Sequence, residues 1–403
     1  MYKSLLIKIV KYLIKYSRLI IGTNNNLILF GAMNGNYYGD NSKYLFEWIL
    51  KHEKRIKCVW VTRDYDVFHQ MKKNGLPAVL MNSIKAVFAL CRAKVAVFTN
   101  SQRDLALDPC LLPNSLHLIA LRHGRSVKRV RFARKKHKIS SDESESRRRE
   151  GNLIKYAIST SEMISDIQEE CLCIGRNKHK VTGYPRNDNI MNFADNNKQK
   201  WNSDFINFSN YDKIILYGPS WRHGRKPTKF FPFDDFKSTE LIDYLEINNV
   251  LMLLRPHVND FNYFLQHNPH CLQLLESKNI KTATHKEFPD VNYLLPFVDI
   301  LISDYSALYH DYLLLNRPII FFPYDYDDFE SLNGFLYDYY KNLPGPAIYT
   351  FLTFIQELKK LFSNIDDYKK SRIMLRNKIH RYRDSNSSAR VYKLIEPMLE
   401  NRK

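Results

Sequence analysis

Several common signatures are missing from this 403-residue sequence, and each absence argues against a class of protein. No G-x-G-x-x-G or Walker pattern occurs, which argues against dinucleotide reduction and against ATP hydrolysis at a P-loop. The six cysteines contain no C-x-x-C pair, and no secretory cleavage signal is visible. The sequence therefore favours a reducing cytoplasm over a disulfide-rich secreted protein.

Acidic residues are also scarce relative to basic ones. The chain has 42 Asp and Glu against 61 Lys and Arg, and its formal net charge is +19. Residues 1–21 carry five basic side chains and residues 122–138 carry nine, with no acid in either segment. Concentrated positive charge of this kind indicates an anionic partner, which is a membrane, a nucleic acid or a phosphorylated substrate.

The first 21 residues predict an amphipathic helix. Basic residues recur every three or four positions on one face, and leucine and isoleucine cover the rest. Lysines in the middle of the segment argue against a helix that spans the bilayer. We expect it to lie on an anionic membrane surface, and the alternative is an amphipathic helix packed on the protein's own core.

Short apolar runs alternate with amphipathic stretches from residue 27 onward, a pattern typical of parallel sheets covered by helices. The polar segment 192–205 interrupts the alternation and is the expected linker. The expected α/β architecture is therefore two Rossmann-like, doubly wound domains facing a cleft. We predict a mobile loop at residues 140–150, and a helical tail after about residue 353 that closes the second domain or crosses back onto the first. The expected strands are 27–32, 58–62, 78–81, 95–99, 116–121, 213–218, 250–255, 298–303 and 318–322.

Polar clusters follow four of the expected strands, where ligands of doubly wound sheets bind. His123 lies in LRHGRSVKR, and a neutral histidine at the mouth of a cleft can take a proton from an attacking hydroxyl. Arg222, with Ser220, could cradle a phosphate, and Arg255 with His257 could stabilise charge on a leaving group. Taken singly, each cluster is equally compatible with an ordinary strand end or a solvated loop.

The segment SDYS at residues 303–306 is the most specific of the four. Ser303, Asp304 and Ser306 suit the start of a helix, whose exposed N–H groups favour a phosphate. The alternative is a helix cap without a ligand. Asp311 lies beyond capping distance, so it could accept a hydrogen bond from a hydroxylated ligand.

A D-x-D pair, Asp325 and Asp327, has the spacing that many nucleotide-sugar enzymes use for a divalent cation. Such acidic clusters are more often solvated loops, and the basic groups above already supply positive charge. The sequence therefore predicts no metal site and no obligatory cofactor.

Taken in order, these motifs resemble the CDP-glycerol glycerophosphotransferase family of teichoic-acid and capsule synthesis. The resemblance runs from about residue 27 to residue 350. It rests on GNYYGDNSKYLFEWI (35–49), LRHGRSVK (121–128), GYPRND (183–188), YGPSWR (217–222), LRPH (254–257), SDYSALYHDYLLLNRPIIFFPYD (303–325) and LPGPA (343–347).

The resemblance implies a GT-B fold with an N-terminal acceptor domain, residues 22–195, and a C-terminal donor domain with terminal helices, residues 206–403. His123 would deprotonate the acceptor hydroxyl, which attacks the donor's β-phosphorus while CMP leaves. Arg255 and His257 would neutralise the diphosphate from one side and Ser306 from the other. The implied donor-binding positions also include Gly124, Arg125, Arg186, Ser220, Arg222 and Asp311.

The departures from the family pattern concern the donor. Arg122 and Arg125 flank the HG pair, where the family usually has Trp before it and small residues or Pro after it, and Ala307 replaces a common second serine. Glycerol and ribitol therefore remain alternatives for the polyol. The expected partners are a CDP-polyol, a lipid-linked or polysaccharide acceptor and the cytoplasmic face of the membrane. The sequence indicates no oligomeric state.

Two other functions remain as alternatives. A GT-B glycosyltransferase would move a sugar from a nucleotide donor and form a glycosidic bond without phosphate. A nucleic-acid-binding protein would use the basic run 122–138 to neutralise phosphates. No nucleic-acid motif accompanies that run, so we expect no nucleic-acid partner.

Overall fold

The computed structural model describes residues 11–12, 14, 16–124, 127–133, 140–194, 206–222 and 226–400. The chain divides into two compact units. Unit 1 comprises Met1–Arg125, Lys138–Asn189 and Arg381–Lys403, and unit 2 comprises Ser126–His137 and Ile190–His380. The division differs from the expected one because the tail from Arg381 belongs to unit 1, and because Ser126–His137 belongs to unit 2. Most of the expected linker lies outside the described residues.

Unit 1 is built on a parallel sheet with the strand order β3-β2-β1-β4-β5-β6-β7. The chain reverses its direction of travel across the sheet between β1 and β4, which is the switch point of a doubly wound fold. The strands are β1 (Asn24–Gly31), β2 (Lys57–Thr62), β3 (Ala78–Leu80), β4 (Ala93–Phe98), β5 (His117–Ala120), β6 (Ile154–Ser159) and β7 (His179–Val181).

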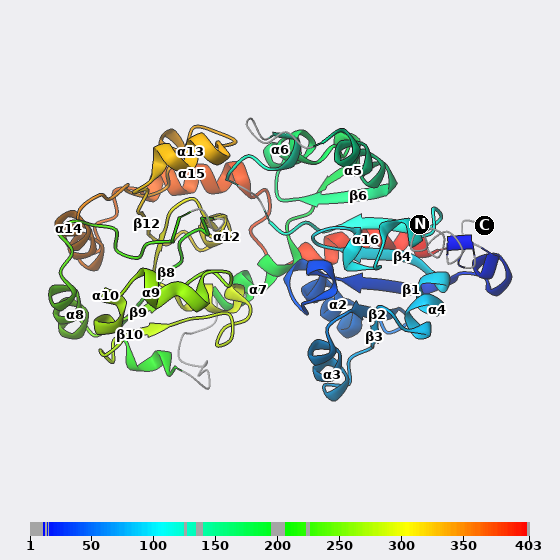
Figure 1. The fold of residues 1–403 in the computed structure, drawn as a ribbon, viewed down its shortest axis with the longest axis horizontal. Coiled ribbons are helices and arrows are strands. Elements are labelled where there is room, and N and C mark those ends of the chain that lie inside the picture. Colours follow the sequence, from blue (N-terminus) through cyan, green and yellow to red (C-terminus); the bar gives the residue numbers. More distant parts are fainter. Residues whose placement is uncertain are drawn as a thin grey trace. The chain divides into compact units, whose positions relative to one another are not determined.

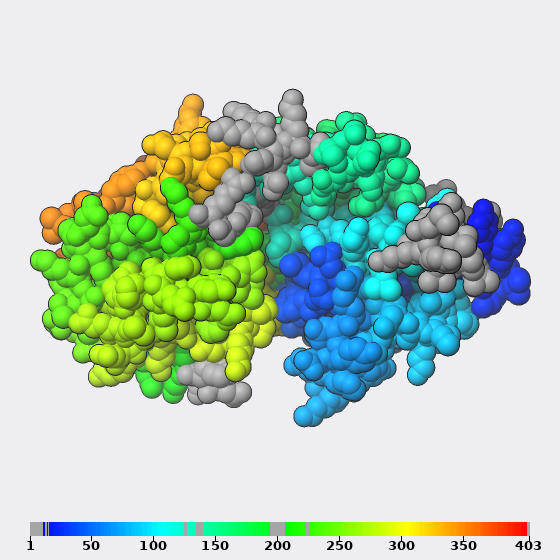
Figure 2. Space-filling model, viewed as in Figure 1, coloured from blue at the N-terminus to red at the C-terminus, as the bar shows by residue number. Residues whose placement is uncertain are grey.

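Helices cover the sheet of unit 1, and one of them comes from the C-terminal end of the chain. Its helices are α2 (Asp40–His52), α3 (Tyr65–Lys73), α4 (Ile84–Arg92), α5 (Ser141–Leu153), α6 (Glu162–Leu172), the first half of α7 (Pro185–Ala194) and α16 (Ser387–Leu399). In Figure 1 the red helix α16 runs beside β1 and β4, and its Val391, Ile395 and Leu399 belong to the core of this unit. By contrast α3, whose residues are all described, buries Met71 alone and forms a blue projection in Figure 2.

The buried Asp188 attaches α16 to unit 1. Its two carboxylate oxygens accept the backbone N–H groups of Ser387 and Ser388, at 2.8 and 2.7 Å, at the first turn of α16. A carboxylate at the N-terminus of a helix satisfies N–H groups that have no partner within the helix. This contact joins residues about 200 positions apart, so it explains why the tail returns to unit 1.

Unit 2 contains a smaller parallel sheet with the order β10-β9-β8-β11-β12, and its switch point lies between β8 and β11. Its strands are β8 (Lys213–Tyr217), β9 (Val250–Leu254), β10 (Ile280–Thr282), β11 (Ile300–Ser303) and β12 (Ile319–Phe321). Its helices are α8 (Ser238–Ile247), α9 (Phe264–His267), α10 (His270–Leu274), α11 (Val291–Leu294), α12 (Leu308–Tyr312), α13 (Tyr326–Asn333), α14 (Phe351–Phe362) and α15 (Lys369–Ile379).

The predicted loop at residues 140–150 is a helix, so that prediction was wrong. Ser140 accepts the N–H of Glu143 at the start of α5. Glu143 then pairs with Arg147, and Glu145 pairs with Arg149, one turn further along. Acidic residues in the first turn and acid-to-base pairs four residues apart both stabilise a helix that buries almost none of its surface.

The predicted amphipathic helix at residues 1–21 lies partly outside the described residues. Residues 16–21 are helical, and Arg18 is buried against unit 1. Its guanidinium donates to the carbonyls of Cys91 and Ala93 at 3.0 and 2.7 Å and to the hydroxyl of Ser115 at 2.8 Å. One basic residue of the predicted headgroup-facing stripe therefore attaches the segment to unit 1. Among the described residues, we found no helix whose length and apolar character would let it cross a bilayer.

Candidate active site

One candidate site of unit 1 is the loop that follows β5. Its backbone takes a left-handed conformation at Arg122, with φ of 62°, and again at Gly124, with φ of 89°. His123 lies between them, and 59% of its side chain is exposed. A side chain at position 124 would place its Cβ 2.4 Å from Nη2 of Arg186. Glycine is therefore required there by both backbone conformation and space.

Four contacts join this loop, α2 and α7. Nδ1 of His123 contacts Oδ2 of Asp40, the first residue of α2. Nη1 of Arg186 donates to Oδ1 of the same carboxylate at 3.0 Å. Asn41 donates to the carbonyl of Arg122 at 2.7 Å and accepts the N–H of Arg186 at 3.1 Å. The expected site residues His123, Gly124 and Arg186 are thus brought together, and Arg125 lies outside the described residues.

The carboxylate of Asp40 determines the electrostatics of this cluster. Burial raises the pKa of Asp40, but the positive charges of His123 and Arg186 outweigh this effect and hold its pKa well below the usual range. In return, Asp40 raises the pKa of His123 above its ordinary value, against the opposing effects of desolvation, Arg186 and Arg122. Sequence analysis assigned no role to Asp40, although GNYYGDNSKYLFEWI contains it.

Unit 2 has a candidate site of its own, at the switch point between β8 and β11. Arg222, with 4% of its side chain exposed, binds two carboxylates. It donates to Asp304 at 2.6 Å, and to both oxygens of Asp325 at 2.8 and 3.0 Å. Asp304 also accepts the backbone N–H of Ser220 at 2.8 Å. Arg222 therefore ties together the loops after β8, β11 and β12, and its expected contact with a donor phosphate stays a prediction.

The SDYS segment connects β11 to the short helix α12. The hydroxyl of Ser303 donates to the carbonyl of Gly218 at 3.1 Å, and both it and Asp304 are buried. Ser306 is only partly buried, and its hydroxyl accepts the N–H of Leu308 at 3.3 Å. Asp311 is buried within α12. Ser303 and Asp304 thus hold the loop after β11 against the loop after β8, while Ser306 stays closer to the surface.

Arg255 and His257 follow β9, next to β8 in the sheet. Arg255 donates to the carbonyl of Ala283 at 2.7 Å, while the ring of His257 is exposed and stacks on Trp221 with centroids 5.6 Å apart. Nδ1 of His257 accepts the N–H of Asn259 at 3.2 Å, so the neutral ring carries its proton on Nε2. Trp221 therefore orients this histidine.

The predicted D-x-D pair is divided between two functions. Asp325 binds Arg222, while Asp327 lies in the first turn of α13 (Tyr326–Asn333). Within the described part of the chain, no three His, Cys, Asp or Glu side chains are grouped as metal ligands would be.

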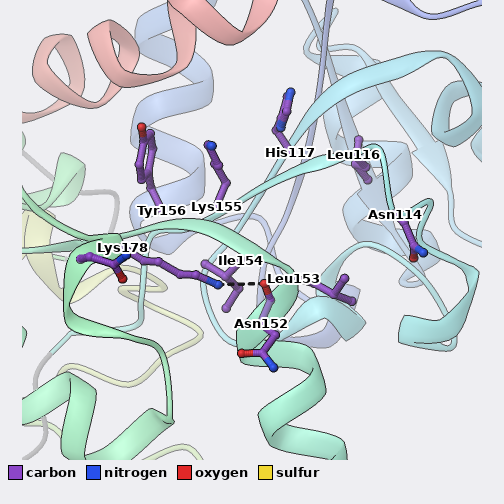
Figure 3. Close-up of a pocket in the computed structure, with 10 residues that line it drawn as sticks. Asn114, Leu116, His117, Asn152, Leu153, Ile154, Lys155, Tyr156 and Lys178 are labelled. Atoms are coloured by element: carbon purple, nitrogen blue, oxygen red, sulfur yellow. Dashed lines mark hydrogen bonds between the residues drawn. The ribbon is translucent and has the colours of Figure 1, made fainter.

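Three cavities of unit 1 lie at the amino ends of the strands, opposite to the ends that His123 follows. One of about 400 Å³ is lined by His117, Lys155 and Lys178, where β5 and β6 begin (Figure 3). In Figure 3, Lys178 donates to the carbonyl of Asn152, at 2.8 Å. His123 instead follows the carboxyl end of β5, which is where doubly wound sheets bind their ligands.

Comparison with known proteins identifies the family. The model of the CDP-Glycerol:Poly(glycerophosphate) glycerophosphotransferase family matches residues 12–397. A teichoic acid glycerol-phosphate transferase of Staphylococcus aureus is 26% identical over 92% of this chain and 93% of its own length. A teichoic acid poly(glycerol phosphate) polymerase of Bacillus subtilis is 28% identical over 85% of this chain and 44% of its own length.

The fold is also similar to that of solved structures. The wall teichoic acid polymerase TagF superposes with a TM-score of 0.77 at 23% identity, covering 99% of this chain and 96% of that chain. The two units are therefore the two Rossmann-like domains of a GT-B-like fold. Because the family model matches nearly its whole length, the chain belongs to the CDP-glycerol:poly(glycerophosphate) glycerophosphotransferase family.

Proposed function

We propose that this protein transfers a polyol phosphate, glycerol phosphate in the first instance, from a CDP-activated donor to a hydroxyl of a teichoic-acid acceptor. The observation that carries the proposal is the family match over residues 12–397. Relatives named as glycerol-phosphate transferase and as poly(glycerol phosphate) polymerase support glycerol. Three ribitol-phosphate polymerases match about half of the chain, so ribitol is the second candidate.

His123 is the proposed general base. Its exposed ring takes the proton from the acceptor hydroxyl, whose oxygen then forms a bond to the β-phosphorus of the donor. The bond between that phosphorus and the bridging oxygen breaks, and CMP leaves with the electron pair. A histidine serves this purpose because its pKa lies near neutrality.

Unit 2 supplies the proposed donor site at the edge where β8, β9 and β11 end. Arg255 and His257 counter the charge of the diphosphate, and Nε2–H of His257 donates to the oxygen that leaves with CMP. Ser306, at the surface beside α12, contacts the phosphate from the other side. Ser220, Ser303, Asp304 and Arg222 hold the loops on which these groups lie. Asp311 is the proposed acceptor for a hydroxyl of the donor. The mechanism needs no metal or other cofactor, because these side chains supply the positive charge.

We further propose that unit 1 works against the cytoplasmic face of an anionic membrane, where a lipid-linked acceptor would lie. Exposed apolar side chains support this proposal, since Leu19 and Ile20 are 73% and 85% exposed. On α4, Ile84 and Phe88 lie one turn apart and are 89% and 49% exposed. Exposed apolar side chains beside the basic segment 1–21 would suit binding at the headgroup region of an anionic membrane.

Two measurements test the proposal. Incubation with CDP-glycerol and a lipid-linked acceptor should release CMP in step with acceptor extension, and His123→Gln should abolish release while leaving donor binding measurable. For the membrane contact, the double substitution Ile84→Ser with Phe88→Ser should reduce flotation with anionic vesicles. Leu352→Ser, at a 60% exposed leucine of unit 2, is the matched control and should float as the wild type does. Equal flotation of all three proteins would refute the membrane contact.

A further inference from the structure

Asp40 is the one carboxylate, among the described residues, that contacts His123 directly. It lies 83 positions earlier in the chain and reaches the ring from the start of α2. We propose that Asp40 is a positioning residue for the transfer reaction. It fixes the tautomer of His123 and stabilises the imidazolium that forms when the acceptor hydroxyl loses its proton. This inference rests on the proposed role of His123 as the base.

The geometry defines which nitrogen can act as the base. Asp40 contacts Nδ1, so the neutral ring carries its proton there and donates it to the carboxylate. Nε2 is then the nitrogen with a free lone pair, on a side chain that is 59% exposed. A carboxylate that holds imidazole in this tautomer is the arrangement that serves hydrolases with a serine nucleophile.

The surroundings of Asp40 keep its carboxylate charged and immobile. Only 4% of the side chain is exposed, and Arg186 binds the oxygen that does not face His123. Arg186 thus supplies the positive charge that a buried carboxylate needs. Each oxygen of Asp40 has a cationic or N–H partner on a different element, so rotation of the carboxylate would break both contacts.

The backbone at Asp40 supports the same interpretation. Its φ of 57° lies in the left-handed region, which a residue other than glycine adopts at some cost. Strain at a functional residue persists where surrounding contacts hold it in place. The neighbouring Asn41 supplies such contacts, because its side chain binds the carbonyls of Leu121 and Arg122 just before His123.

The test is Asp40→Asn, which keeps the size of the side chain and tolerates a positive φ. We expect kcat/KM to fall at least about 100-fold, because the ring loses its correct tautomer and its counter-charge. The acidic limb of the pH profile should also move to lower pH. The base must be neutral to act, and loss of the carboxylate lowers the pKa of His123 while Arg186 and Arg122 continue to lower it.

Asp104→Asn is the matched control. Asp104 is also buried in unit 1, where it accepts the backbone N–H groups of Asn34, Thr99 and Asn100. Its substitution should lower the melting temperature and leave the acidic limb where it is in the wild type. A limb that moves equally in both variants would show a general structural effect and would overturn the inference.

Two further results separate this inference from the proposed function. If His123→Gln keeps near-normal turnover, the assignment of the base fails, and the inference fails with it. If His123→Gln is inactive while Asp40→Asn has the kcat/KM and pH profile of the wild type, the inference about Asp40 fails alone.

Should Asp40→Asn not fold, ¹⁵N NMR of the wild-type protein decides the question. The His123 signals are assigned by their loss in His123→Gln. A neutral ring protonated on Nδ1 supports the inference, and one protonated on Nε2 overturns it.

Discussion

Replacement of Arg222 by methionine would leave two carboxylates of unit 2 without their shared cation. Asp304 has 2% of its side chain exposed and Asp325 has 13%, so water cannot readily take the place of the guanidinium. Asp304 would keep the N–H groups of Ser220 and Tyr305, but these carry no net charge. The variant therefore buries negative charge that is no longer compensated.

The expected loss is about 3–5 kcal/mol, which is typical when one partner of a buried ion pair is removed. For a unit of this size, each kcal/mol lowers the melting temperature by about 2–4 °C, so the predicted shift is roughly 6–20 °C. The loops after β8, β11 and β12 should loosen first, because Arg222 lies in the first loop and binds a carboxylate in each of the other two. Donor binding should weaken in consequence.

The assay is thermal unfolding of the full chain, with hydrogen exchange to locate the change. Lys226→Met is the matched control. Lys226 follows β8 and pairs with Asp328 of α13, so this ion pair joins the segments after β8 and β12 as Arg222 and Asp325 do, but its two side chains are 60% and 55% exposed. This exposed pair should have little effect, because solvent screens it. Equal melting temperatures for Arg222→Met and Lys226→Met would refute this reasoning. So would hydrogen exchange that rises elsewhere in the chain while the loops after β8, β11 and β12 stay protected.

Three further predictions follow from other contacts. Ser306→Ala should weaken CDP-glycerol binding, measured by calorimetry, by about 1–3 kcal/mol, because a buried phosphate oxygen would lose its hydrogen-bond partner. Unchanged affinity would show that Ser306 serves only to accept the N–H of Leu308. Arg18→Ala should lower the free energy of unfolding by about 1–3 kcal/mol, because carbonyls at the end of α4 lose their donor, and an unchanged melting temperature would contradict this. Asp188→Ala should increase hydrogen exchange in α16 more than in α14, and equal exchange would show that the capping contact does not hold the tail.

The central strands could be predicted from sequence because both of their faces are buried. Strands such as β1, β8 and β9 form continuous apolar runs, which few other structures produce. The edge strands β7 and β10 have three residues each, with a lysine in the middle, and carry no such signal. Polar, short edge strands protect a sheet from further pairing, so their weak signal has a physical cause.

The loops of the site could be located from sequence, but the partners of their side chains could not. Polar clusters after apolar runs predicted that the segments around His123, Ser220 and Ser303 lie at strand ends, and the structure places them there. Asp40 and Asp325 lie 83 and 103 positions from the residues they bind, so only the strand order brings them together. The sequence suggests a phosphate ligand for Arg222, which stays a prediction, and it gives no sign of the two carboxylates that the fold places against the guanidinium.

The most direct test of the proposed reaction is to identify both products of a single incubation. The purified protein is given CDP-glycerol and a lipid-linked acceptor, the nucleotide is identified by chromatography, and the new linkage is identified by ³¹P NMR. The account predicts CMP in equal amount to a new phosphodiester. Turnover of a nucleotide sugar instead, with release of a nucleoside diphosphate and a glycosidic bond without phosphate, would contradict it.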